Sequence, residues 1–189
     1  MKDTLSAVAV FCGSRFGNNP GYEQAAREIG AGLARAGLRL VYGGGDVGLM
    51  GATADAAIEA GGQVTGVIPS FLEAREIMHQ GVAELIITED MHERKTIMFG
   101  RADAFLILPG GFGTFDELME ITTWKQLQLH TKPVIIVNVL NWADSVLMML
   151  DAAVAQGFAS ADARALIETV PDTAAALRRL AASGVMANC

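Results

Sequence analysis

The sequence predicts an α/β fold in which helices cover both faces of a doubly wound parallel sheet. Short apolar runs alternate along the chain with longer Ala-rich segments, which carry Ala, Leu, Met, Glu and Arg at helical spacing. The apolar runs are nearly continuous, which is typical of strands that are buried on both faces. Strand followed by helix, repeated, predicts βαβ units with right-handed crossovers and therefore a parallel sheet.

The elements follow one another in a regular order. The expected strands are Val8 to Phe11, Leu38 to Tyr42, Val64 to Ile68, Glu84 to Ile87, Ala104 to Leu108, Val134 to Val139 and Ile167 to Val170. The expected helices are Tyr22 to Ala36, Leu49 to Ala60, Glu93 to Arg101, Phe115 to Leu129, Ala143 to Ala155 and Ala174 to Leu180. Pro133 stands at a strand entrance, where its missing N–H is tolerated, and Pro171 stands near the start of the last helix. No linker rich in Ser or Pro interrupts this order, so we expect residues 1–189 to form a single Rossmann-like nucleotide-binding domain.

The charge balance limits the partners of the protein. Its 189 residues include 14 Lys and Arg against 21 Asp and Glu, a formal net charge of −7 at pH 7. This is the wrong sign for a protein that holds nucleic acid through counterion release, so we expect no nucleic-acid partner. A pocket for one anionic group is compatible with this charge, because net charge does not determine a single site.

The cysteines and apolar runs point to the cytoplasm. Cys12 lies inside an apolar run and Cys189 is the last residue, so they do not form a disulfide framework. The longest stretch without Asp, Glu, Lys or Arg, Ala60 to Leu72, is broken by Gly, Gln, Pro and Ser. It is shorter than the roughly 18 apolar residues that cross a membrane. We therefore expect a cytoplasmic protein without a membrane partner.

Three of the expected strands end in glycine-rich segments. These segments are Gly13-Ser14-Arg15, Tyr42 to Gly48 with Gly44 and Gly45 inside it, and Pro109 to Thr114. Ligands of open α/β sheets bind beyond the carboxyl ends of the strands. Glycine lets the backbone approach a ligand closely, and a helix that begins there offers unpaired N–H groups to an anion. The pattern predicts phosphate binding, with Ser14, Gly44 and Gly45 among the contacts.

Two standard nucleotide motifs fit poorly. Gly43, Gly45 and Gly48 match the spacing of the dinucleotide fingerprint G-x-G-x-x-G, but the acidic residue expected about 20 positions later is replaced by Val67-Ile68-Pro69-Ser70. The alternative is that these glycines serve only a tight turn and close helix packing. The chain has no Gly-Lys dipeptide, which excludes a P-loop.

The segment Pro109 to Glu117 has two interpretations. Thr114 and Glu117 have the T-x-x-E spacing of a capping box, which would stabilise the start of a helix without any function. However, Gly110, Gly111 and Gly113 lie where a phosphate could be held, and Glu117 near a helix N-terminus is kept ionised by the helix dipole. Glu117 is therefore a candidate for chemistry on a sugar attached to that phosphate. Asp116 and Glu120 are candidates for a second carboxylate on the same face, although a solvated helix edge explains both equally well.

A charged cluster, Met91-His92-Glu93-Arg94-Lys95, opens another expected helix. A run of charges is often only a solvated helix turn. An acidic protein that binds phosphate nevertheless needs local cations, and Arg94 with Lys95 is the densest pair near a helix start. Metal catalysis is not expected, because His79, His92 and His130 are scattered and no ligand-spaced Cys pair occurs.

These motifs together resemble the LOG family, named "Lonely Guy". The resemblance rests on Pro109 to Glu117, on Met91 to Lys95 and on Tyr42 to Gly51, and it extends from Phe11 to about Asn138. It implies a cytokinin riboside 5′-monophosphate phosphoribohydrolase that acts as a homodimer, with Arg94 and Glu117 as the catalytic pair. It further implies that Gly110, Gly111, Gly113 and Thr114 bind the 5′-phosphate and that Glu76, Lys95 and Thr123 contact the substrate.

The implied substrate is AMP or N6-prenylated AMP, cleaved to the free base and ribose 5-phosphate without a cofactor. Proteins with this motif have also been labelled lysine decarboxylases. That chemistry requires a pyridoxal Schiff base on a lysine, and the only candidates are Lys2, Lys95, Lys125 and Lys132. Two further alternatives stay open, a general AMP nucleosidase and a nucleotide carrier or sensor that binds without cutting. Met91 and Met98 are candidates for the N6 pocket, and Met98, Met119 and Trp124 for either a dimer interface or the core.

Overall fold

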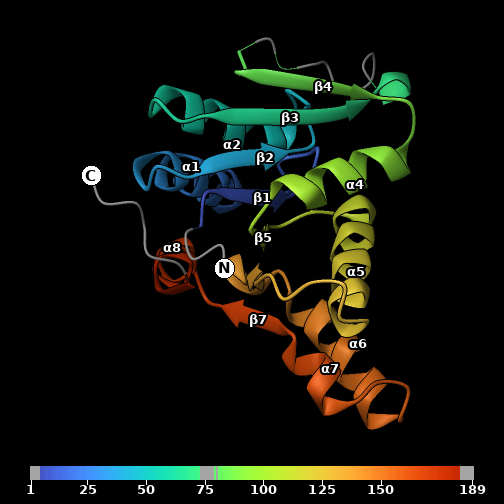
Figure 1. Cartoon of the computed structure of the whole chain (residues 1–189). Coiled ribbons are helices and arrows are strands. Elements are labelled where there is room, and N and C mark those ends of the chain that lie inside the picture. The colour runs from blue at the N-terminus through green and yellow to red at the C-terminus, as the bar shows by residue number, and fades with distance from the viewer. Residues whose placement is uncertain (1–4, 73–78, 80, 184–189) are drawn as a thin grey trace.

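The computed structural model describes residues 5–72, 79 and 81–183. Its strands form one parallel sheet in the order β4-β3-β2-β1-β5-β6-β7 (Figure 1). Their bounds are β1 Ala7–Phe11, β2 Arg39–Tyr42, β3 Val64–Pro69, β4 Glu84–Thr88, β5 Ala104–Ile107, β6 Val134–Val137 and β7 Ile167–Val170. The chain runs outward from β1 to β4, then returns to β5 on the other side of β1. The crevice between β1 and β5 is thus the point where a doubly wound sheet binds its ligands.

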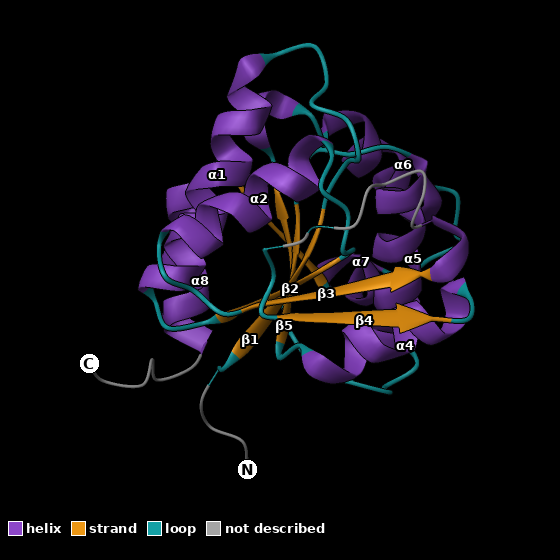
Figure 2. Cartoon of the chain, turned by 90° about the horizontal axis from the view of Figure 1, so that it is seen from above, coloured by secondary structure: helices purple, strands orange, loops and turns teal. Residues whose placement is uncertain are grey.

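Helices cover both faces of the sheet, as the sequence predicts. Their bounds are α1 Pro20–Arg35, α2 Gly48–Glu59, α4 Met91–Arg101, α5 Phe112–Gln126, α6 Asp144–Ala155, α7 Ala161–Ala165 and α8 Thr173–Ser183. Buried side chains from α1, α2 and α8 share one core cluster with Val8 and Val10 of β1. Those of α4, α5 and α6 share a second cluster with Ala7, Ala9 and Phe11 of the same strand. Figure 2 shows these two groups of helices on opposite sides of the strands.

Two kinds of element differ from the prediction. The short helix α7 and two 3-10 turns, Ser70–Leu72 and Val139–Asn141, were not expected. Single turns bury too few residues to produce a periodic apolar pattern, so the sequence does not signal them. None of the helices in the described ranges has the length and apolar character that crossing a lipid bilayer requires.

His130, in the turn before β6, is buried in the second core cluster against the edges of Phe99 and Phe105. Its Nδ1 accepts a hydrogen bond from Lys132 N (3.1 Å), which leaves the proton of the neutral ring on Nε2, 2.9 Å from the Ile121 carbonyl oxygen. Burial, together with the charges of Lys132 and Lys125, lowers the pKa of His130 below its ordinary value. The fold thus favours the neutral ring.

We expect the low pKa of His130 to make the free energy of unfolding decrease as the pH falls. Because the folded-state pKa is below the unfolded value of about 6.5, the contribution is complete above that pH and is lost as pH falls below it. The free energy of unfolding, measured by urea at pH 7.0 and 5.5, should fall by less than about 1.4 kcal/mol per pH unit on account of this one proton. The decrease should be shallower in His130→Gln and unchanged in His92→Gln, since His92 is an exposed residue of α4. Equal slopes in all three proteins would contradict the prediction.

Candidate active site

A cavity of about 540 Å³ opens at the carboxyl ends of β1 and β5. It is lined by the β1–α1 segment, the starts of α2 and α4, the β5–α5 loop with the first turns of α5, and Trp142 after β6. Glycine-rich segments from two of the three strand ends singled out in the sequence, at Gly13 and at Gly110, therefore meet in one place. This is the crevice that the strand order predicts for a ligand.

A second cavity of about 590 Å³ lies at the amino ends of the strands, where helices α1, α2 and α4 end. Its two arginines, Arg39 and Arg101, both pair with Glu84, at 3.8 and 2.7 Å. Helix C-termini carry partial negative charge, so this edge disfavours an anion. The cavity at the carboxyl ends of the strands is the better candidate for a phosphate-bearing ligand.

Helix α5 begins three residues earlier than the sequence predicts, at Phe112 instead of Phe115. Gly111 is the N-cap, without a side-chain cap hydrogen bond, and the helix starts at Phe112. The capping-box prediction for Thr114 and Glu117 is therefore wrong. Both residues lie inside the helix, one turn apart on the same face, and both are buried. The early start occurs because the Gly111 carbonyl accepts the first helical hydrogen bond, from Phe115 N (3.0 Å).

The start of α5 is open toward the cavity. A methyl group on Gly111 or Gly113 would meet no atom within 4 Å, and both residues line the cavity. The first turn of a helix leaves N–H groups without intrahelical partners, and the helix dipole adds partial positive charge there. The arrangement suits an anionic group such as a phosphate.

Gly110 is required for a different reason, close packing. A Cβ at this position would lie 2.0 Å from Thr114 Oγ1 and 3.0 Å from Gly13 N. Gly13 N in turn donates to the Pro109 carbonyl oxygen at 3.0 Å. Gly110 therefore lets the loop after β5 lie directly against the loop after β1, and this contact brings Ser14 and Arg15 to the rim of the same cavity.

Helix α4 supplies a buried arginine to the cavity. Its N-cap is Asp90, whose carboxylate accepts from Glu93 N at 2.8 Å, while Glu93 accepts from Glu89 N at 2.8 Å. The exposed first turn thus contains Glu93, whereas Arg94 points inward with a side chain that is only 7% exposed. The interpretation of this segment as a solvated helix turn holds for Glu93 and not for Arg94.

Arg94 and Glu117 face one another across the cavity floor. Arg94 Nη2 lies 3.9 Å from Glu117 Oε1 and 3.5 Å from the Gly43 carbonyl oxygen, and the Glu117 side chain is 10% exposed. Arg94 Nε is buried and has no hydrogen-bond partner among the described residues. A buried donor without a partner is costly. A polar group of a ligand in the cavity would relieve that cost.

Cys12 also lines the cavity but is unsuited to nucleophilic chemistry. Burial raises the pKa of its thiol to about 12, since a thiolate there would be desolvated and would lie near the Glu117 charge. The reactive form of a cysteine is the thiolate. Cys12 therefore acts as a small apolar wall residue.

Gly44 and Gly45 are buried and do not line the cavity. Gly44 has φ +80° and packs against Ile68 and Val67 of β3. The start of α2, which follows this segment, is capped by the Gly13 carbonyl oxygen, which accepts from Leu49 N (3.0 Å) and Met50 N (3.3 Å). Because these N–H groups are satisfied, the alternative that the second glycine segment serves packing agrees with the geometry. The predicted substrate contacts of Gly44 and Gly45 stay predictions.

Lys95 and Thr123, two further predicted contacts, do not line the cavity. Lys95 Nζ pairs with Asp116 Oδ2 (2.7 Å) and Glu120 Oε2 (3.1 Å), so it joins α4 to α5. Thr123 is exposed near the end of α5 and donates to the Met119 carbonyl oxygen. Glu76 lies outside the described residues. The roles of these three residues in substrate binding therefore stay predictions.

The sequence reasoning did not assign several residues that line the cavity. They are Arg15, Phe16 and Tyr22 from the segment after β1, Phe112 at the start of α5, and Trp142. Trp142 stacks on Phe115 at 5.8 Å between ring centroids. Of these residues, Arg15 could have been predicted from the sequence, because it belongs to the strand-end segment Gly13-Ser14-Arg15.

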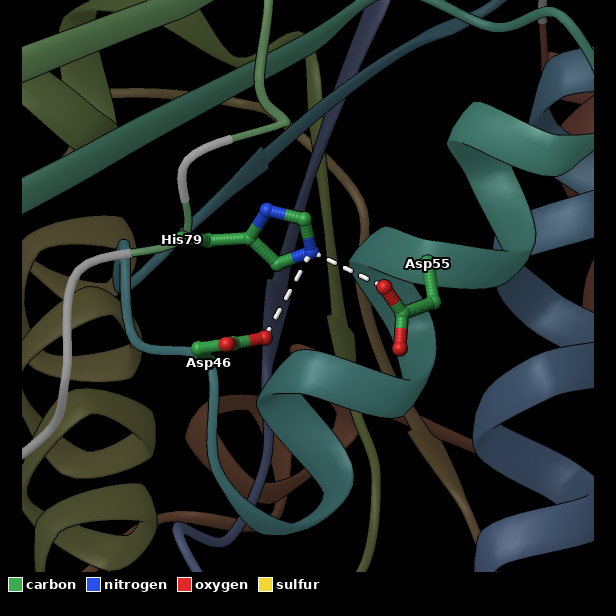
Figure 3. A group of neighbouring side chains, drawn as sticks. All are labelled: Asp46, Asp55 and His79. Carbon is green, nitrogen blue, oxygen red and sulfur yellow. Dashed lines mark hydrogen bonds and ion pairs between the residues drawn. The ribbon is translucent and has the colours of Figure 1, made fainter.

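Asp46, Asp55 and His79 form a separate cluster outside the cavity lining (Figure 3). His79 Nε2 lies 3.0 Å from Asp55 Oδ1 and 3.7 Å from Asp46 Oδ1, and His79 Nδ1 accepts from Gly81 N at 3.0 Å. The proton of the neutral ring is therefore on Nε2. A histidine that binds a metal through Nε2 carries its proton on Nδ1, which would oppose the Gly81 N–H. The cluster ties the segment before β4 to α2, and its hydrogen bonds do not favour a metal ion.

The chain is similar to known proteins along most of its length. The family described as "possible lysine decarboxylase" matches residues 50–180. Cytokinin riboside 5′-monophosphate phosphoribohydrolase LOG2 of Arabidopsis thaliana is 45% identical over 179 residues, which cover 95% of this chain and 84% of that protein. Cytokinin riboside 5′-monophosphate phosphoribohydrolase LOG of Oryza sativa subsp. japonica is 46% identical over 164 residues, which cover 87% of this chain and 68% of that protein. The chain belongs to the LOG family.

Solved structures confirm the fold of this LOG-family chain. The molybdenum cofactor carrier protein of Chlamydomonas reinhardtii has a TM-score of 0.68 at 22% identity, covering 94% of this chain and 99% of that one. The molybdenum cofactor binding protein of Rippkaea orientalis has a TM-score of 0.71 at 19% identity, covering 94% and 96%. At these identities the similarity concerns the Rossmann-like sheet alone.

The decarboxylase description does not fit the lysines of this LOG-family chain. Decarboxylation of lysine would need a lysine in the cavity to hold pyridoxal phosphate as a Schiff base. Within the described ranges, Lys95 pairs with carboxylates, Lys125 Nζ donates to the Leu166 carbonyl oxygen and Lys132 Nζ donates to that of Phe99. None of the three lines the cavity, and Lys2 lies outside the described residues. The cavity therefore does not suit this cofactor.

Proposed function

We propose that this LOG-family chain hydrolyses the N-glycosidic bond of adenosine 5′-monophosphates, including N6-modified ones, to the free base and ribose 5-phosphate. The observation that carries the proposal is the Arg94–Glu117 pair on the floor of a cavity whose rim is the glycine-rich start of α5. A phosphate at the helix start and a carboxylate one to two turns away match the two ends of a ribose 5-phosphate unit. Relatives named as cytokinin riboside 5′-monophosphate phosphoribohydrolases give further support.

Glu117 has the chemistry that this reaction needs. Cleavage of a glycosidic bond develops positive charge on the sugar ring as the C1′–N bond breaks. A carboxylate nearby stabilises that charge and can take a proton from the attacking water, whose oxygen then bonds to C1′. In this proposal the departing base receives the electron pair of the broken bond and the proton that Glu117 takes from the water, so that Glu117 is a carboxylate again at the end.

Arg94 and the α5 loop have positioning roles. Arg94 is fixed by burial and by its contact with the Gly43 carbonyl, and its free Nε can donate to a ribose or phosphate oxygen. Gly110, Gly111, Gly113 and Thr114 would hold the 5′-phosphate at the helix start. Holding the substrate at both ends lowers the entropic part of the barrier.

Incubation of the pure protein with AMP and with N6-isopentenyl-AMP tests the proposal, with chromatographic detection of the free base. We expect release of adenine, of N6-isopentenyladenine, or of both. Efficient release from the isopentenyl substrate alone would indicate cytokinin activation, and similar release from both would indicate a general AMP nucleosidase. Binding of both nucleotides without any base release would contradict the enzyme and leave a carrier or sensor.

We further propose that the protein works as a homodimer in the cytoplasm. Several large apolar side chains are exposed at the end of α5, on α6 and just after α6, namely Leu127, Leu129, Met148, Met149 and Phe158. In contrast, Met98 is fully buried and belongs to the second core cluster, whereas Met119, which packs against that cluster, and Trp124, which contacts Phe99, are partly buried. Sedimentation equilibrium of the wild type and of Met148→Glu would test the dimer, since the charge should weaken an apolar interface.

A further inference from the structure

We propose that Arg15 is a specificity-determining residue that selects substrates with a 5′-phosphate over the corresponding nucleosides. This inference rests on the proposed function and assigns the phosphate-recognising cation within it. Within the described ranges, two positively charged residues line the cavity, Arg15 and Arg94. They occupy different parts of it and have different surroundings.

Arg94 has its charge compensated. It is buried beside Glu117, so the formal charges of this pair cancel at neutral pH. The Cys12 thiol is neutral because its pKa is about 12. The remaining formal charge of the described cavity lining is that of Arg15. A phosphate monoester carries about −1.5 to −2 at pH 7, and the protein as a whole carries −7, so attraction of the phosphate depends on this local cation and on the α5 helix start.

The backbone places Arg15 at the phosphate end of the cavity. Gly13, two residues before it, contacts Gly110 at the start of the α5 loop, where a Cβ on Gly13 would lie 3.3 Å from Gly110 Cα. On the other side, Gly48 adopts φ +62°, and a Cβ there would lie 2.3 Å from Arg15 N. The Arg15 backbone is therefore held between the start of α2 and the β5–α5 loop.

The side chain of Arg15 is available for a ligand. It is exposed, lines the cavity and has no hydrogen bond or ion pair with the described residues. A guanidinium matches two phosphate oxygens at once, which makes arginine a better phosphate ligand than lysine at such a position. The second glycine segment, Tyr42 to Gly48, contains no lysine or arginine that could take this role.

Steady-state kinetics with AMP and adenosine test the inference in Arg15→Ala, Arg15→Lys and the control Arg178→Ala, which removes an exposed charge of α8. We expect Arg15→Ala to raise KM for AMP about 10- to 100-fold, in line with hydrogen bonds to charged groups, with kcat within about twofold. Activity on adenosine should not change, Arg15→Lys should be intermediate, and Arg178→Ala should match wild type. Unchanged KM for AMP, or equal loss on AMP and adenosine, would overturn the inference.

Calorimetric binding of ribose 5-phosphate separates this inference from the proposed function. If wild type releases no base, the hydrolase proposal fails, while Kd for ribose 5-phosphate still reports on Arg15. We expect a Kd about tenfold or more weaker in Arg15→Ala than in wild type and in Arg178→Ala. Equal Kd values, or no binding to wild type, would overturn the role of Arg15.

Discussion

Replacing Glu117 by Gln is expected to lower kcat for base release from AMP by at least about 100-fold, with Kd for AMP changed only a few-fold. The amide keeps the size of the side chain and its place on α5, next to Arg94. It cannot take a proton from water, and it offers no negative charge to the developing positive charge on the sugar. Because the loss concerns the transition state rather than the ground state, it should appear in kcat and not in binding.

Glu120→Gln is the matched control for this experiment. Glu120 lies one turn further along α5 and pairs with Lys95 outside the cavity lining, so its amide variant should keep kcat within about twofold of wild type. Titration calorimetry with AMP gives binding for each variant, and chromatography gives turnover. A folded Glu117→Gln protein that loses binding and turnover equally, or that retains turnover, would show that Glu117 is not the catalytic carboxylate.

Gly43→Ala is expected to lower kcat/KM for AMP about 100-fold while the melting temperature changes by only a few degrees. A Cβ on Gly43 would lie 2.2 Å from Arg94 Nη2 and 2.9 Å from Met50 Sδ. Both atoms are at the ends of flexible side chains, so the fold can yield at small cost. The guanidinium must then leave its present position beside Glu117, and a displacement of about 1 Å in a catalytic group can cost about 100-fold in rate.

Gly100→Ala provides the comparison for Gly43→Ala. Gly100 lies in α4, where an added Cβ would meet no atom within 4 Å. Alanine favours the helix by about 0.5 to 1 kcal/mol, so this variant should be slightly more stable and fully active. Thermal unfolding and the kinetics with AMP, measured on both variants, test whether the position of Arg94 controls activity. Normal activity in Gly43→Ala would mean that the position of Arg94 is not critical.

Much of the fold follows from the sequence because its signals are local. Continuous apolar runs and Ala-rich helical spacing place the strands and the long helices within a few residues of those in the structure. The shift of α5 has a local cause as well, since Gly111 rather than Thr114 precedes the first helical residue. A T-x-x-E spacing fits both a helix start and a helix interior, so the pattern could not separate them.

The candidate site is predictable in residue type but only partly in geometry. Pro109 to Glu117 and Met91 to Lys95 could be identified from their residues, and the structure brings Glu117 and Arg94 together. The second glycine segment is rich in glycine like the β5–α5 loop, yet the helix start that follows it is already capped by the Gly13 carbonyl. Composition alone does not tell whether an N–H group at a helix start is free or satisfied.

Arg94 and Lys95 illustrate what each level determines. The sequence by itself determines that two adjacent cations stand near the start of a helix in a doubly wound sheet. Adjacent residues on a helix point about 100° apart, so only one of them can face the cavity. The packing of α4 against α5 and β1 decides which, turning Arg94 toward Glu117 and Lys95 toward Asp116 and Glu120. That choice depends on contacts between segments far apart in the chain, which no local pattern contains.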